Sequence, residues 1–210
     1  MATIAVLGTL DTKGEEHGFV ADLIRARGHQ ALLIDVGTLE PPKMQPDISR
    51  EEVARVAGFD LATLVARRDR GESVAAMSQG APAILTRLLA EKKIDGVISL
   101  GGGGGTSICT AGMRALPIGF PKLMVSTLAS GHTAQYVGVK DIVMMPSIVD
   151  VAGLNRISRQ ILTRAAGAIC GMVEAIVPPA TDKPVIVASQ FGNTTDCVNH
   201  ARQLLEQAGY

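Results

Sequence analysis

Short apolar runs alternate with polar turns and with amphipathic stretches along most of the chain. The runs are rich in Val, Ile and Leu, and each is short enough to be a strand that is buried on both faces. Such strands, separated by helices, build parallel sheets. The pattern therefore predicts an α/β protein with a Rossmann-like, doubly wound and mostly parallel sheet, whose strands lie at residues 3–7, 31–36, 96–100, 122–126 and 142–145.

Apolar residues at steps of three and four predict the helices between these runs. The segment 61–93 reads as two helices that are broken near Arg70. A helix is expected at 106–115, with one of its first two hydroxyl residues as the N-cap. The longest helix is expected at 151–176.

The C-terminal part of the chain has a different character. Prolines predict a linker at 178–184, because they disfavour both helices and central strands. An apolar run at 185–189 and a helical pattern at 198–207 follow. We therefore expect a first domain at 1–177, and then the first strand-helix pair of a second α/β domain that is truncated.

Composition narrows the function classes. Hydrophobic residues make up 47% of the chain but aromatic residues only 3%, so the core is built mainly from aliphatic side chains. Twenty basic residues balance twenty acidic ones, which argues against nucleic acid and membrane surfaces as partners. Three widely spaced cysteines do not suggest a disulfide framework, and no signal peptide or membrane span is visible. A cytoplasmic protein is expected.

Three polar turns that contain glycine follow the apolar runs, at 8–14, 101–107 and 126–132. Because the carboxyl ends of parallel strands meet at one edge of a sheet, we expect these turns to build one pocket. They offer backbone N–H groups, hydroxyls and the cation of Lys13, all suited to phosphate oxygens. A glycine run that is simply a flexible loop is the alternative interpretation.

Asp11 and Asp150 are the acids expected to hold a magnesium ion, directly or through water. Ordinary turn capping is the alternative role for both of them. Asp35, at the end of the second strand, stands where some nucleotide-binding folds keep a ribose-binding acid, although an acid solvated at a strand end is equally consistent.

Specific catalytic motifs are weak. The turn 8–14 lacks the spacing and the final Lys-Ser/Thr of a Walker A loop, and the glycine run fits G-x-G-x-x-G only trivially. A Ser126, His132 and Asp150 triad has no G-x-S-x-G elbow to support it, and His132 alone is more simply a loop residue. No reaction follows from these patterns.

Three further side chains that could carry chemistry are one cysteine and two histidines. Cys109, near a helix N-terminus, is either a nucleophile or, as we favour, a small buried residue. His17 and His29 are expected on helix surfaces.

Four segments, in this order, resemble one bacterial, fungal and plant family: GTLDTKGEE, ISLGGGGGTS, LMVSTLASGHTAQYVGVKDIVMMPSIVDVAGLN and ASQFGNTTDCVNHARQLLEQAGY. The family includes the tomato mosaic virus resistance protein with its ATP-binding N-terminal domain. The resemblance covers essentially the whole chain. It implies two Rossmann-like halves, ATP bound with magnesium in the first half, and self-association into homodimers.

The resemblance also implies which residues contact the nucleotide. One departure is Gly103, which stands where relatives often have serine in a GGSGGT form, so a hydroxyl contact is absent here. The expected contacts are Gly8, Thr9, Asp11, Lys13, Gly101, Gly102, Gly103, Gly104, Gly105, Thr106, Ser126, Thr127, Ser130 and Gly131.

The leading hypothesis is a magnesium-dependent ATP-binding domain with a regulatory or assembly role. The second is an enzyme that uses ATP or a phosphorylated metabolite, with Lys13, Asp11 and His132 as its polar side chains and an active site completed by a second half. The third is an interaction domain whose glycine loop binds nothing.

Overall fold

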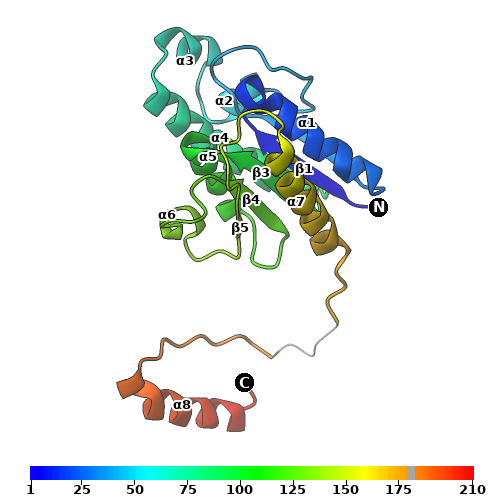
Figure 1. Ribbon diagram of the computed structural model, residues 1–210. Helices are drawn as coiled ribbons and strands as arrows, with labels where there is room; N and C mark the ends of the chain where they lie inside the picture. The colour runs from blue at the N-terminus through cyan, green and yellow to red at the C-terminus, as the bar shows by residue number, and fades with distance from the viewer. Residues whose placement is uncertain (179–182) are drawn as a thin grey trace. The chain divides into compact units, whose positions relative to one another are not determined.

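The computed structural model describes residues 1–178 and 183–210 (Figure 1). The chain divides into two units, Met1–Ala175 and Ile176–Tyr210. Of the linker expected at 178–184, residues 179–182 lie outside the described residues.

The first unit is built on a five-stranded sheet in which every pairing is parallel. The strand order is β2-β1-β3-β4-β5, so the order reverses between β1 and β3. This confirms the predicted α/β, Rossmann-like fold. The strands are β1 (Thr3–Gly8), β2 (Gln30–Asp35), β3 (Gly96–Gly101), β4 (Lys122–Ser126) and β5 (Val143–Pro146).

Helices cover both faces of this sheet (Figure 1). One face packs against α1 (Leu10–Ala26) and α7 (Arg156–Glu174). The other packs against α2 (Arg50–Val56), α4 (Arg70–Ala90) and α5 (Gly103–Ala115), with α3 (Leu61–Arg67) beside them. The short α6 (Ala134–Val137) lies between β4 and β5 in the chain.

The alternation of side-chain direction along the strands explains why the core has two layers, one on each face of the sheet. In β1, Ala5 and Leu7 contribute to the cluster on the α4 and α5 side, whereas Ile4 and Val6 contribute to the cluster on the α1 and α7 side. Successive side chains of a strand point to opposite faces, so a strand buried on both faces is apolar at every position.

Two helix starts differ from the sequence-based expectation. Helix α5 begins at Gly103 with Gly102 as its N-cap, so the glycines themselves form its first turn. Helix α7 begins at Arg156 because Asn155 caps it, accepting hydrogen bonds from the backbone N–H groups of Ile157 and Ser158.

The second unit contains a short 3-10 turn (Gly192–Thr194) and helix α8 (Thr195–Gln207). The strand predicted at 185–189 is wrong: these residues form no strand. Val185 and Val187 are 87% and 88% exposed. A parallel strand needs a neighbour to accept its hydrogen bonds, and the described part of this unit contains no strand to pair with. Within the described residues, none of the helices has the length and apolar character needed to cross a membrane.

The turn after β1 is fixed by a buried histidine. His17, which we expected on a helix surface, is fully buried, and its Nδ1 donates to the backbone carbonyl of Lys13 at 2.7 Å. Lys13 has non-helical backbone angles and kinks α1 there. Burial lowers the pKa of His17, which keeps the ring neutral. Its ring packs on Gly8, where a Cβ would lie 1.8 Å from Nε2.

His29 also departs from the expectation of a helix-surface residue. It stands in the turn before β2, and its Nε2 lies 2.8 Å from the Glu174 carboxylate at the end of α7.

The end of β2 is joined to the start of α1 by Asp35. Its Oδ1 accepts hydrogen bonds from the backbone N–H groups of Leu10, at 3.0 Å, and Gly37, at 2.8 Å. The carboxyl is fully buried, and burial raises its pKa. Asp35 therefore organises the loops at the edge of the sheet, and its burial leaves it no ribose-binding role.

Replacing Asp35 with asparagine is expected to change the pH dependence of stability. Because the folded-state pKa of Asp35 is raised above 3.8, the folded state binds more protons than the unfolded state over the range above that value. The free energy of unfolding of the wild type therefore falls as the pH rises and Asp35 loses its proton. Asparagine does not titrate, so the variant has no such loss. Urea unfolding at several pH values between about 4 and 7 should show the variant gaining stability relative to the wild type with rising pH. If the stability of the variant minus that of the wild type stays constant or falls with rising pH, the assignment is contradicted.

Gly8→Ala is expected to destabilise the first unit by about 1 to 3 kcal/mol or more, because the new Cβ overlaps the His17 ring. The matched test is the double variant Gly8→Ala/His17→Ala, in which the ring is gone. If the clash is the cause, the two substitutions cost less together than the sum of their separate effects in chemical denaturation. Additive costs would show that another contact explains the effect.

Candidate functional site

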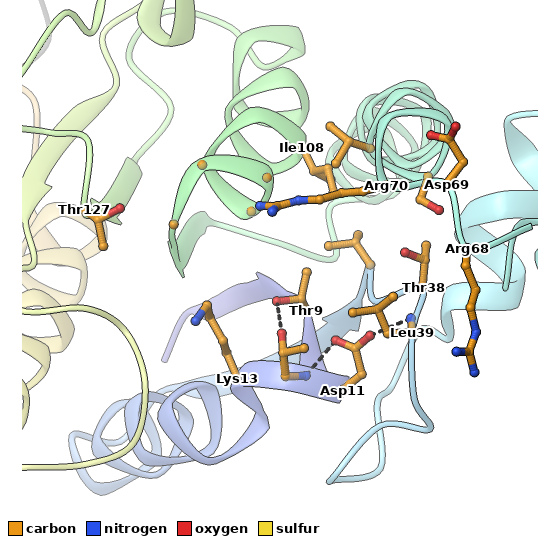
Figure 2. Close-up of a pocket in the computed structure, with 18 of the residues that line it drawn as sticks. Thr9, Asp11, Lys13, Thr38, Leu39, Arg68, Asp69, Arg70, Ile108 and Thr127 are labelled. Carbon is orange, nitrogen blue, oxygen red and sulfur yellow. Dashed lines mark hydrogen bonds between the residues drawn. The ribbon is translucent and has the colours of Figure 1, made fainter.

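A cavity of about 550 Å³ opens at the carboxyl edge of the sheet. It lies where the turns after β1 and β3 meet, which is the point where the strand order reverses and where open α/β sheets bind ligands. Figure 2 shows the arrangement. The cavity is lined by Thr9, Asp11, Thr12, Lys13, Val36, Thr38, Leu39, Arg68, Asp69, Arg70, Ser73, Val74, Gly102, Gly103, Gly104, Gly105, Ile108, Thr127 and Asp150.

The glycine segment 102–105 forms one wall of this cavity and the first turn of α5. In an α-helix the first N–H groups have no partner within the helix, and the dipole places partial positive charge there. No side chain caps this helix, because the N-cap residue is Gly102. The start of α5 therefore presents free donors toward the cavity.

Neither backbone conformation nor packing requires glycine along most of this segment. None of Gly102, Gly103, Gly104 and Gly105 has a positive φ. A Cβ at Gly102 or Gly105 would come no closer than 3.8 Å to another atom, and at Gly103 no closer than 4.0 Å. In a helix interior alanine is favoured over glycine by about 1 kcal/mol, so glycine is not the residue that helix propensity selects at 103–105. What glycine provides here is an uncovered backbone on the cavity side.

Hydroxyl groups hold the glycine segment from behind. The hydroxyls of Thr106 and Ser126 are 2.7 Å apart, and both residues are fully buried. Ser126 Oγ also accepts from the backbone N–H of Leu128 at 3.0 Å, while the Thr127 N–H donates to the Gly101 carbonyl at 3.2 Å. This network ties the end of β3, the start of α5 and the end of β4 together.

Three cations line the cavity. Lys13 was expected there, and its Nζ donates to the backbone carbonyl of Val151. Arg68 and Arg70 were missed by sequence reasoning, which placed a helix break near Arg70 without assigning it a role. The RRDR sequence at that break was the available signal. Arg68 adopts a left-handed conformation, with φ of 52°, that ends α3.

Three carboxylates line the same cavity, namely Asp11, Asp69 and Asp150. Asp11 is 3% exposed, and its two oxygens accept from the N–H groups of Thr12 and Leu39 at 2.7 and 2.9 Å. Asp69 caps α4. Asp150 is exposed and uses one oxygen to accept from the Val151 N–H at 2.8 Å. Asp69 and Asp150 are thus both exposed, and each has one oxygen that accepts no hydrogen bond from a backbone N–H of the described residues, whereas Asp11 is buried with both oxygens engaged.

A second cavity of about 380 Å³ adjoins the first, since Thr127 and Asp150 line both. Its wall is rich in hydroxyls and comes from the loops that follow β4 and β5. It is lined by Ser126, Thr127, Ser130, Pro146, Ser147, Ile148, Val149 and Asp150.

The predicted contacts thus fall into separate groups. Thr9, Asp11, Lys13, Thr127 and the glycines of 102–105 meet in the first cavity. Ser126 and Ser130 reach only the second cavity. Four predicted contacts line neither cavity, namely Gly8, Gly101, Thr106 and Gly131. Gly8 packs against His17, and the Thr106 hydroxyl is hydrogen-bonded to that of Ser126.

The interpretation that we favoured for Cys109, a small buried residue, is confirmed, and the unsupported triad is not formed. Cys109 is fully buried, and burial raises the pKa of its thiol to about 12, so it is a core residue. The hydroxyl of Ser126 is engaged with Thr106 and Leu128, and His132 is exposed on a loop outside both cavities, so the triad is not formed.

Comparison with known proteins places this architecture in a family. A family model described as "Uncharacterised protein family (UPF0261) N-terminal domain" matches residues 2–178. A UPF0261 protein of Clostridium tetani is 50% identical over 208 residues, which cover 99% of this chain and 52% of the relative. A Rhizobium meliloti relative is 50% identical over 198 residues, covering 94% of this chain and 49% of its own length.

A tomato relative, the ToMV susceptible protein tm-1(GCR26), is 32% identical over 235 residues, covering 97% of this chain and 30% of the tomato protein. The expected kinship with the tomato protein is therefore confirmed. The chain spans about half the length of the bacterial relatives it matches. The matched model extends from β1 through α7, and on this evidence the chain belongs to the UPF0261 family, with residues 2–178 corresponding to its N-terminal domain.

Proposed function

We propose that the first cavity binds ATP together with magnesium, and that the domain uses this binding for regulation or assembly. The observation that carries the proposal is the glycine segment 102–105: glycine is less favourable than alanine in a helix, yet a Cβ at Gly102, Gly103 or Gly105 would come no closer than 3.8 Å to another atom. Uncovered N–H groups at a helix start are suited to phosphate oxygens. Lys13 and Arg70 supply cations beside them.

The remaining lining fits the other part of a nucleotide. Val36, Leu39, Val74 and Ile108 give the cavity an apolar wall suited to a base, and Thr38 offers a hydroxyl nearby. A volume of about 550 Å³ lies within the range of small-molecule sites. ATP itself is the ligand that the family resemblance implies.

Magnesium fits the donors present. No group of three or more His, Cys, Asp or Glu side chains that could hold a metal occurs in the described residues. Magnesium commonly keeps several waters and is held by one or two carboxylates plus substrate phosphates. Asp150, with an accessible oxygen, would be the direct ligand, and Asp11 would act through water or hold the turn. When bound, the ion neutralises phosphate charge.

An enzyme that transfers or hydrolyses phosphate is the second candidate function. The second cavity favours it, because Thr127 and Asp150 stand between the proposed phosphate site and a space of about 380 Å³ for another molecule. Phosphate release from ATP by the full-length protein, above that of an Asp150→Asn variant, would favour the enzyme over the binding domain. Self-association into homodimers and a cytoplasmic location stay predictions.

Lys13→Ala is expected to weaken ATP binding about tenfold, because a charge-assisted contact to phosphate is lost. Isothermal titration calorimetry measures the effect. Lys93→Ala is the matched control, since Lys93 pairs with Glu91 beyond the end of α4 and lines neither cavity. Equal ATP affinity in the Lys13 variant and the wild type would remove Lys13 from the site, and no ATP binding by the wild type would end the proposal.

Asp150→Asn is expected to abolish most of the gain in ATP affinity that magnesium gives. Without magnesium the variant should bind ATP at least as well as the wild type, because a negative charge near the phosphates has been removed. Titrations with and without the ion separate the two effects. A variant that keeps the full magnesium-dependent gain shows that Asp150 is not a ligand of the ion.

A further inference from the structure

We propose that Arg70 is the specificity-determining residue of the first cavity. It binds a second phosphate beside the one held at the start of α5, so that the site prefers ligands with two or more consecutive phosphates to those with one. The proposal rests on the phosphate binding proposed above, and adds to it a role for a residue that no sequence motif identified.

The position of Arg70 supports this role. Figure 2 shows its guanidinium directed across the cavity toward the first turn of α5. A Cβ placed on Gly104 would lie 3.6 Å from Nη2 of Arg70 and 3.9 Å from its Nε. The guanidinium therefore lies beside the glycine backbone assigned to the first phosphate. A planar guanidinium can grip a phosphate with two parallel hydrogen bonds, which an ammonium group cannot do.

The α3–α4 junction delivers Arg70 to this position. Arg68 ends α3 in the left-handed conformation, and Asp69 caps α4 by accepting from the Glu72 N–H at 2.8 Å. Only these two residues separate the helices, so the first residue of α4 is held at the rim of the cavity. Arg68 lines the cavity as well, but Figure 2 shows its side chain directed away from α5.

Electrostatics in this region favour an added anion. Arg70 is the first residue of α4, where the helix dipole disfavours a cation, and the uncapped start of α5 adds positive potential. Among residues 1–178 and 183–210, no carboxylate forms an ion pair with Arg70, whereas Arg67 pairs with Glu72. The Asp69 carboxylate offsets part of this charge. An anion bound here would relieve the remaining repulsion.

Lys13 faces the same space from the other side. In Figure 2 its side chain rises from α1 toward the cavity, opposite Arg70, and Thr127 lies further along the same edge. A phosphate at the glycine segment would therefore have one cation on each side. A chain of two phosphates would offer additional oxygens to Arg70 while keeping the glycine contacts, whereas a single phosphate would have to share its few oxygens between the glycine segment and the cations.

The test compares inorganic phosphate with inorganic pyrophosphate by calorimetry, without magnesium. The wild type should bind pyrophosphate about tenfold more tightly or better, the size expected of one added charge-assisted contact. Arg70→Gln should lose most of this preference while keeping its affinity for phosphate. Arg70→Lys should keep part of it. Arg67→Gln, three residues away and outside the cavity, should behave as the wild type.

Each other outcome decides a different question. An Arg70→Gln variant with an unchanged preference, or with the same loss for phosphate and pyrophosphate, overturns the role of Arg70. A wild type that binds neither anion overturns the phosphate site itself, whatever the variants do.

Thermal denaturation of the ligand-free protein gives a second readout. Arg70→Gln should raise the melting temperature by about 1 to 3 °C, because an unfavourable cation is removed from a helix start. A merely structural arginine would give the opposite sign. A variant that melts lower than the wild type would therefore overturn the electrostatic part of the proposal.

Discussion

The parallel pairing of β1 with β3 is the constraint on which the candidate site depends. In this register Leu7 lies opposite Ser99, so the two strands end side by side and deliver their turns to the same space. Both strands are buried on both faces, and their alternate residues serve two different cores. A slip of one residue would exchange those two sets of side chains, and the packing of the helices on both faces of the sheet resists it. The relative positions of the turns that line the cavity are thus fixed by the packing of the hydrophobic core.

Much of this arrangement can be predicted from the sequence because it is local. A short apolar run predicts a strand, and a glycine-rich turn directly after it predicts an exposed backbone at the edge of the sheet. The five strands and the meeting of Thr9, Lys13 and the glycine segment follow from such signals. The expectation that the ligand is ATP came from the resemblance to relatives, because hydrophobic periodicity alone does not identify a ligand.

What escaped prediction depends on distant contacts. The helical period gives no warning that His17 is buried, because the residue that it packs against is Gly8 in the preceding strand. Arg70 belongs to a helix break whose neighbour in space, Gly104, is remote in the chain. The run at 185–189 has the composition of a strand, yet a strand exists only where another strand receives its hydrogen bonds.

The charges that line the first cavity also have a kinetic consequence. Its three cations are matched by three carboxylates, and the chain as a whole has a formal net charge of zero. Such a surface projects little field beyond the roughly 10 Å over which salt screens charges. An anionic ligand would therefore be recognised only at close range, without long-range steering, and its association rate would vary little with ionic strength.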